Sequence, residues 1–508
     1  MARDEKFVEH IQTGYTTKGD YIFMGAAMLE GKPFPEAQIK IPLKTLNRHG
    51  LIAGATGTGK TKTLQILAEN LSEKGIPVLL MDIKGDLSGI AKAASINEKL
   101  ETRHKIIGFE FKPQASPVEL LSLSEQPGVR LKATVSEFGP VLLARILDLS
   151  DTQTGIMAIV FKYCDDNHLP LLDLKDLKKI IQFATNEGKE EFEKSYGRMS
   201  KMSTGTILRK IVALEQQDAD LFFGEPSFEV QDLVRKTPEG KAYVNIIRLT
   251  DIQDKPKLFS TFMLSLLAEI YSTFPEKGDS DKPELVLFID EAHLIFKEAS
   301  GALLDQIESI IKLIRSKGVG IFFVTQNPTD VPQEVLSQLG LKIQHSLRAF
   351  TANDRKAIKL TAENYPISEF YDTKEVLTSL GIGEALISAL DEKGRPTPLA
   401  ATMMRAPMSR MDILTPQEIN NLINVSPLFF KYNKTIDRES AYELLNHKIK
   451  AAEKEDAKEK AKKDRKNIER TASKSMRSSG KSRGAIIKVL TSATFIRSVM
   501  SILNKAFK

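Results

Sequence analysis

Three short stretches of the sequence contain residue types that could bind and hydrolyse a nucleotide. Residues 54–61 read Gly-x-x-x-x-Gly-Lys-Thr, the complete pattern of a phosphate-binding loop. The loop follows an apolar run, residues 49–53, and precedes a helix-like run, residues 63–72. Glycines let the backbone close around phosphate groups, and the following helix directs its amino terminus toward them. The order of strand, loop and helix therefore predicts a nucleotide site rather than a chance glycine-rich turn.

The positions of this loop have distinct expected roles. Lys60 would reach the β- and γ-phosphates of the nucleotide, and Thr61 would hold Mg²⁺. We expect ATP and Mg²⁺ as cofactors, with Lys60 counted among the catalytic residues. The expected nucleotide contacts are Gly54, Ala55, Thr56, Gly57, Thr58, Gly59, Lys60, Thr61 and Lys62.

A second stretch supplies acidic residues at the end of an apolar strand. Residues 285–289 are continuously apolar and lead into Asp290 and Glu291. Asp290 would hold Mg²⁺ through water, and Glu291 would polarise the attacking water. The alternative is a strand that ends in a solvated acidic turn, but the phosphate-binding loop in the same chain favours the catalytic interpretation.

A third apolar strand, residues 320–325, ends at Gln326. An amide side chain beside the acidic strand could hydrogen-bond both the γ-phosphate and the water, and so sense whether the phosphate is present. The alternative is a turn residue before Asn327-Pro328, a pair that favours turns.

The elements around these residues alternate between apolar strands and helix-like segments, which favours a mostly parallel α/β sheet. We expect a small strand-rich segment (1–45), an ATPase core in two parts (46–115 and 236–410) and a helical insertion (116–235). A C-terminal helical extension (411–446), a charged linker (447–483) whose first part could be an exposed helix, and an amphipathic helix (484–508) would follow. A hairpin is predicted from residues 384–390 and 397–404.

Composition limits the class of protein. The hydrophobic share of 42% and the charged share of 27% are ordinary for a globular protein. With Cys164 as its single cysteine, the chain can form neither an internal disulfide nor a multi-cysteine metal site. We see no secretory signal and no apolar run of about 18 residues, so we expect a cytoplasmic protein without an integral membrane segment.

Charge is unevenly distributed along the chain. The net charge is +6, yet residues 448–508 contain 18 Lys and Arg against 6 Asp and Glu, so the rest of the chain is acidic. A basic tail alone does not establish nucleic-acid binding. The last stretch has an apolar stripe with alternating spacings of three and four residues, typical of one helix face: Ile486, Val489, Ala493, Ile496, Met500, Leu503 and Phe507.

Several motifs in order resemble the HerA/FtsK class of P-loop motor ATPases. They are residues 54–61, 82–86 (DIKGD), 290–293 (DEAH), Arg315 and 325–326 (TQ). Residues 47–61 (NRHGLIAGATGTGKT) and 344–351 (QHSLRAFT) resemble the bacterial HerA-like, YjgR-type subfamily. The resemblance covers roughly residues 15–410.

This resemblance implies a RecA-like P-loop NTPase core and a homo-oligomeric ring, usually a hexamer, with ATP bound between subunits. It assigns Arg315 as an arginine finger that reaches the γ-phosphate of the neighbouring subunit, a role suited to a permanently charged guanidinium. The alternative is that Arg315 only interacts with the carboxyl end of its helix.

Asp82 and Lys84 end the strand that follows the phosphate-binding loop and its helix. Asp82 would contact Mg²⁺ or its waters, and Lys84 could do the same. A plain structural salt bridge is the alternative for this pair.

Two functions follow from these observations. The first is an ATP-driven ring motor, a DNA translocase or helicase-type ATPase acting on double-stranded DNA, supported by the motif set and the basic tail. The second is an oligomeric ATPase that remodels or scaffolds a protein partner, supported by the terminal amphipathic stripe.

Overall fold

The computed structural model describes residues 3–252, 255–278, 280–298, 301–434, 436 and 438–478. The chain divides into two units, residues 1–442 and residues 443–508. The predicted amphipathic helix, residues 484–508, lies outside the described residues.

In the described part of the chain, twelve strands form one sheet with the order β2-β1-β12-β11-β10-β3-β9-β8-β4-β7-β5-β6. Their bounds are β1 (Tyr21–Leu29), β2 (Lys32–Pro42), β3 (Gly50–Ala53), β4 (Val78–Asp82), β5 (Val118–Ser122), β6 (Val129–Arg130), β7 (Val244–Arg248), β8 (Leu285–Ile289), β9 (Val319–Thr325), β10 (Leu341–Gln344), β11 (Glu384–Ser388) and β12 (Ala400–Met404). The strands from β10 to β6 are parallel, and those from β2 to β11 are antiparallel. The predicted mostly parallel α/β sheet is thus confirmed.

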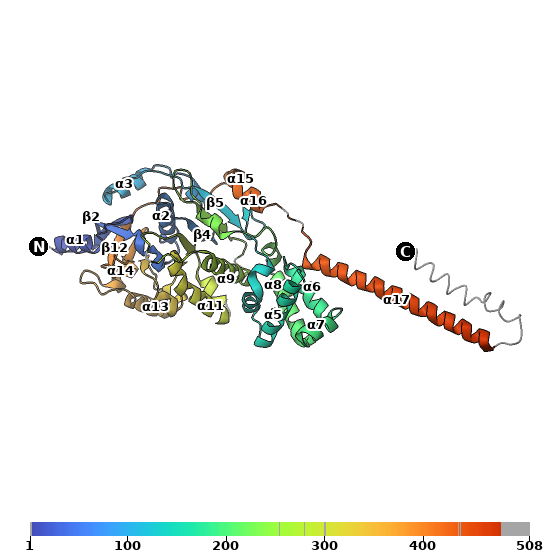
Figure 1. The fold of residues 1–508 in the computed structure, drawn as a ribbon. Helices are drawn as coiled ribbons and strands as arrows, with labels where there is room; N and C mark the ends of the chain where they lie inside the picture. Colours follow the sequence, from blue (N-terminus) through green and yellow to red (C-terminus); the bar gives the residue numbers. More distant parts are fainter. Residues whose placement is uncertain are drawn as a thin grey trace. The chain divides into compact units, whose positions relative to one another are not determined.

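Helices flank the sheet and also form a separate group beside it (Figure 1). Their bounds are α1 (Arg3–Gly14), α2 (Lys60–Glu73), α3 (Glu98–Ile106), α4 (Val135–Ile146), α5 (Asp151–Asp166), α6 (Leu174–Thr185), α7 (Lys189–Tyr196), α8 (Lys201–Glu215), α9 (Pro256–Thr273), α10 (His293–Glu298), α11 (Gly301–Ile314), α12 (Gln333–Leu336), α13 (Ala352–Glu363), α14 (Thr373–Ser379), α15 (Pro416–Asn424), α16 (Pro427–Tyr432) and α17 (Ala441–Ser478). Short 3₁₀ turns include η4 (Val230–Val234) and η5 (Arg315–Lys317).

The two faces of the parallel strands are buried by different helices. Leu64 of α2 belongs to the same buried cluster as Ile52 of β3 and Phe322 of β9. The next residue of β9, Phe323, points the other way and contacts Phe296 of α10, with ring centroids 5.4 Å apart. Because side chains alternate along a strand, α2 and α10 must cover opposite faces. The strands are therefore buried on both sides, which explains their continuous apolar sequences.

The segment predicted as a helical insertion, residues 116–235, differs from that prediction at its start. Residues 118–122 and 129–130 form β5 and β6, which extend the sheet beyond β7. Helices α5 to α8 follow and lie together in Figure 1, where α6 contacts both α7 and α8. These short strands escaped prediction because the neighbouring charge-rich sequence has helical spacing.

Both ends of the chain also differ from a simple interpretation of their composition. The strand-rich segment, residues 1–45, begins with a helix, α1, whose buried Phe7 and Ile11 join the main core cluster. In the charged linker, residues 447–483, the exposed helix considered for its first part extends as far as Ser478, because α17 runs from Ala441 to that residue. Its abundant Ala, Glu, Lys and Arg are good helix formers even without a buried face.

Candidate functional site

Four neighbouring parallel strands bring the predicted residues to the edge of the sheet that is formed by the carboxyl ends of these strands. In the order β3-β9-β8-β4, these strands are followed by the glycine-rich loop, Gln326, the pair Asp290 and Glu291, and Lys84. Parallel strands present their carboxyl ends at the same edge, which is where ligands bind in open α/β sheets. Gln326, exposed at the end of β9, therefore lies between the loop and the acidic pair, the place that its predicted sensing role requires.

The loop has the backbone geometry of a phosphate cradle. Gly54, Gly57 and Gly59 have φ values of 151°, 79° and 118°, which L side chains rarely adopt. Helix α2 begins at Lys60, so its first amide groups have no partner within the helix and can face an anion. The Lys60 ammonium is buried and donates to the carbonyl oxygens of Gly54, at 2.7 Å, and Ala55, at 3.2 Å.

The loop is supported from the neighbouring strand by His345, a residue whose role could not be predicted from the sequence. The His345 amide donates to the Ala53 carbonyl at 2.7 Å, and its ring nitrogen Nε2 lies 2.9 Å from Thr63 Oγ1. The second ring nitrogen, Nδ1, lies 2.8 Å from the carbonyl oxygen of Glu384. A Cβ at Gly54 would lie only 2.5 Å from the Cβ of His345, which leaves glycine as the residue that fits.

The support of the loop by His345 could not be predicted from the sequence because it depends on the order of the strands in the sheet. Residues 344–351 carry part of the family resemblance, but only the parallel pairing of β10 with β3 reveals that His345 lies beneath the loop. The loop is further tied to the β11 side of the sheet, where the Gly383 amide donates to the Thr58 carbonyl at 3.0 Å.

His345 also makes a pH-dependent contribution to stability. Burial lowers the pKa of His345 from 6.5 to about 4. The unfolded chain therefore takes up the proton first, and the contribution is lost as the pH falls from about 6.5 toward 4. The variant His345→Asn lacks this contribution. For each unit by which the pH falls across that range, its unfolding free energy should therefore rise by roughly 1.4 kcal/mol relative to that of the unmodified protein, as measured by urea unfolding.

Comparing His345→Asn with the unmodified protein isolates the effect of this histidine on the pH dependence of stability. Burial raises the pKa of Asp82 to about 7 and that of Asp290 to about 6, so these carboxyls change stability in the opposite direction. A difference between the two proteins that stays constant from pH 7.5 to pH 5 would contradict a buried neutral imidazole.

The acidic pair lies just beyond the end of β8 and is almost fully buried. The Glu291 amide donates to Asp290 Oδ1 at 2.9 Å, and Glu291 itself has a φ of 47°. Lys84 Nζ lies 2.5 Å from Glu291 Oε1 and 3.9 Å from Asp290 Oδ2. His293 Nδ1 lies 3.1 Å from Glu291 Oε2. The pair is thus enclosed by two potential cations, of which Lys84 makes the closer contact.

Asp82 is held differently from the other acidic residues. Its carboxylate accepts hydrogen bonds from the backbone amides of Gly85, Asp86 and Leu87 at 2.7, 3.1 and 3.2 Å. These bonds close the turn after β4 and leave less of the carboxylate for a metal. The salt bridge considered for this strand end involves Lys84 with the acidic pair, while the contact of Asp82 with Mg²⁺ stays a prediction.

Arg315 lies at the opposite edge of the sheet, which is formed by the amino ends of the parallel strands. It begins η5, just before the amino end of β9, whereas the loop and the acidic pair follow the carboxyl ends of the strands. The structure therefore does not bring Arg315 to the site of its own chain. Its charge lowers the pKa of His49, a buried residue whose pKa falls to about 4, mainly through burial.

A family comparison decides how this arrangement is classified. The family model described as Helicase HerA-like C-terminal matches residues 28–507. The chain belongs to this family. The predicted HerA-like resemblance is therefore confirmed at the level of the family.

Relatives of this HerA-like chain include helicases and an import protein. It is 24% identical over 355 residues to the DNA double-strand break repair helicase HerA of Sulfolobus acidocaldarius, covering 69% of this chain and 64% of the relative. It is 24% identical over 416 residues to the probable helicase MJECL08 of Methanocaldococcus jannaschii, covering 74% and 71%. The DNA import protein CedB of Sulfolobus acidocaldarius is 25% identical over 363 residues, covering 69% and 51%. The chain thus spans less than two thirds of the length of the HerA relative.

Solved structures support the RecA-like P-loop fold of this HerA-like chain. The bacterial conjugative coupling protein TrwBdeltaN70 is similar with a TM-score of 0.51 and 14% identity, over 80% of this chain and 94% of that chain. The plasmid coupling protein TrwB in complex with the ATP analogue ADPNP gives a TM-score of 0.50 at the same identity and the same coverage.

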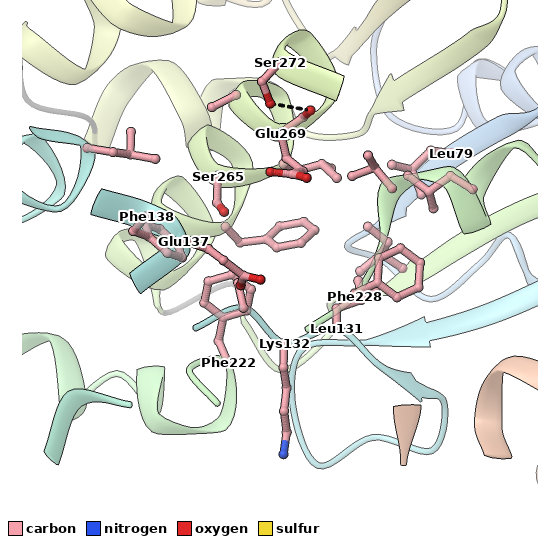
Figure 2. A pocket seen from close by; sticks show the side chains of 18 of the residues that line it. Leu79, Leu131, Lys132, Glu137, Phe138, Phe222, Phe228, Ser265, Glu269 and Ser272 are labelled. Atoms are coloured by element: carbon pink, nitrogen blue, oxygen red, sulfur yellow. Dashed lines mark hydrogen bonds between the residues drawn. The ribbon is translucent and has the colours of Figure 1, made fainter. Parts of the chain in front are cut away.

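The HerA-like chain also contains a cavity of about 420 Å³ (Figure 2). Its walls come from α4, α9 and strands β4, β5 and β7, and they include Phe138, Phe222 and Phe228. None of the predicted site residues lines it, so its size does not make it the chemical centre. In the described residues, no helix is long and apolar enough to cross a membrane.

Proposed function

We propose that this HerA-like protein hydrolyses ATP with Mg²⁺ and uses the energy to move on DNA as a ring-shaped motor. One observation carries the enzymatic part of the proposal: adjacent parallel strands deliver the glycine-rich loop, Gln326 and the pair Asp290 and Glu291 to one edge of the sheet. Binding and hydrolysis of a nucleoside triphosphate need these groups together.

The chemistry of the donors fits a divalent cation. Two buried carboxyls near the loop, Asp82 and Asp290, have raised pKa values because of burial, and neighbouring carboxylates raise them further. A cation would relieve that repulsion. In the described residues, no group of three or more His, Cys, Asp or Glu side chains is placed to hold a metal. Mg²⁺ commonly keeps waters and binds phosphate oxygens beside one or two protein ligands, which agrees with this sparse set.

The protein residues would then divide the work. Residues 54–62 bind the phosphates, with Lys60 at the β- and γ-groups, while Thr61 and Asp290 hold Mg²⁺ and Asp82 contributes through water. When bound, Mg²⁺ neutralises charge on the phosphate oxygens. Glu291 accepts a hydrogen bond from the attacking water and orients it, and Gln326 contacts the γ-phosphate and that water.

Assembly into a ring would complete the site. Arg315 lies at the sheet edge opposite the loop, so in this proposal it acts on the ATP of a neighbouring subunit. A guanidinium supplied across an interface stabilises negative charge developing on the transferred phosphoryl group. The family resemblance favours a hexamer.

Action on DNA is supported by the similarity to a DNA double-strand break repair helicase and by the basic residues 448–508, and we propose double-stranded DNA as the substrate. We expect duplex DNA to stimulate ATP hydrolysis, and its affinity to fall at least tenfold between about 50 and 200 mM salt, because bound phosphates release counterions. The measurement is phosphate release with and without duplex DNA, together with fluorescence anisotropy of labelled DNA across the salt range.

The same preparation must be shown to be oligomeric by sedimentation. An oligomer that hydrolyses ATP but neither binds duplex DNA at low salt nor responds to it would contradict the DNA motor. That result would favour the alternative, an ATPase that remodels or scaffolds a protein partner.

A further inference from the structure

Lys84 reaches the acidic pair from the neighbouring strand. It lies two residues beyond the end of β4, which pairs in parallel with β8, so its side chain can cross to the residues that follow β8. Its ammonium is 2.5 Å from Glu291 Oε1 and 3.9 Å from Asp290 Oδ2. The closest contact is therefore with one oxygen of the residue proposed to polarise the water.

This contact differs from an exposed ion pair. The Glu291 side chain is 7% exposed and that of Lys84 is 34% exposed, so water screens the interaction poorly. The φ of 47° at Glu291 is uncommon for a residue with a side chain, and it persists only where the surroundings fix it. The contacts of Glu291 include Lys84 on its side chain and Asp290 on its amide.

The two carboxylate oxygens of Glu291 have different surroundings. Oε1 is held by Lys84, whereas Oε2 is buried and has no hydrogen-bond partner among the described residues. His293 Nδ1 is within 3.1 Å of Oε2 but does not form a hydrogen bond with it. A buried acceptor without a partner is costly, so Oε2 is suited to a ligand or water that supplies a donor.

The other loop lysine does not replace Lys84 in this contact. Lys60 donates to the carbonyl oxygens of Gly54 and Ala55 in the glycine-rich loop. Each lysine thus has its own partner.

We propose that Lys84 is a positioning residue for Glu291: it fixes Oε1 and so leaves Oε2 directed to the attacking water. This inference rests on the proposed ATP hydrolysis. Two roles were open for Lys84, a salt bridge and a contact with Mg²⁺ or its waters. The proposal assigns Lys84 to the salt bridge with Glu291.

Kinetics of Lys84→Met and Lys84→Arg test the proposal. We expect Lys84→Met to lower kcat roughly tenfold to a hundredfold, the usual effect of removing a group that orients a catalytic residue, with KM for ATP within about twofold. Lys84→Arg, which keeps the charge, should recover part of kcat. Lys112→Met is the control, because Lys112 is exposed and pairs with Glu110 away from the site. In Lys84→Met/Glu291→Gln, the lysine change should cause no further loss of kcat.

Melting temperatures without nucleotide give a second readout. We expect Lys84→Met to lower the melting temperature, since a buried carboxylate loses its partner, and the additional change Glu291→Gln to restore part of it. Strictly additive shifts would contradict the pairing.

The failures are distinguishable. Unchanged kcat in Lys84→Met overturns the proposal for Lys84 alone, provided that the unmodified protein hydrolyses ATP and Glu291→Gln does not. A raised kcat, or a large rise in KM at constant kcat, also overturns it, because Lys84 would then restrain Glu291 or bind phosphate. No ATP turnover by the unmodified protein overturns both proposals.

Discussion

Glu291→Gln is expected to bind ATP with nearly unchanged affinity and to release phosphate at least about a hundredfold more slowly than the unmodified protein. A glutamine keeps the shape and a hydrogen-bonding oxygen but cannot accept the proton of the attacking water, and general-base groups typically contribute 10²- to 10⁴-fold. Binding is measured with a fluorescent ATP analogue and turnover by phosphate release under saturating ATP.

A matched control is Glu334→Gln, which changes an exposed glutamate on α12. Its turnover should equal that of the unmodified protein. Normal turnover by Glu291→Gln would remove Glu291 from the catalytic role and would indicate that the acidic end of β8 is a solvated turn.

Arg315→Ala is expected to lower ATP turnover about a thousandfold while the oligomer remains intact. Arginine fingers contribute 10³- to 10⁵-fold in related phosphoryl transfers, because they neutralise charge that develops only in the transition state. Lys312→Ala, which removes an exposed positive charge from the preceding helix, should have little effect.

Mixing two inactive variants separates the roles of Arg315. Lys60→Ala loses its own nucleotide site but keeps Arg315, whereas Arg315→Ala keeps an intact site. If the arginine acts between subunits, mixed oligomers of the two variants should regain part of the activity. A mixture that stays inactive despite confirmed subunit exchange would favour the alternative, an arginine that only stabilises the end of its helix.

The glycine-rich loop and the acidic strand could be predicted because each is encoded by neighbouring residues. An apolar strand, a glycine-rich turn and a helix predict the place of Lys60, and the continuous apolar run before Asp290 predicts a strand buried on both faces. The mostly parallel sheet follows from the alternation of such segments, and the structure confirms it. The domain boundaries and the individual catalytic roles stay predictions.

What escaped prediction depends on contacts between distant segments. His345 supports the loop only because β10 lies beside β3, and the partner of Lys84 is defined only by the pairing of β4 with β8. The strands β5 and β6 were missed inside a charge-rich region because their role as an extension of the sheet is set by β7, more than a hundred residues later. Local patterns do not contain these pairings.

We expect the residues that follow β3, β9 and β8 to hydrolyse ATP. Release of inorganic phosphate from ATP by the purified chain, compared with Lys60→Ala, tests it most directly. We expect Mg²⁺-dependent turnover by the unmodified chain and its loss in Lys60→Ala. Equal phosphate release by both proteins, or none by an oligomer that binds ATP and Mg²⁺, would contradict it.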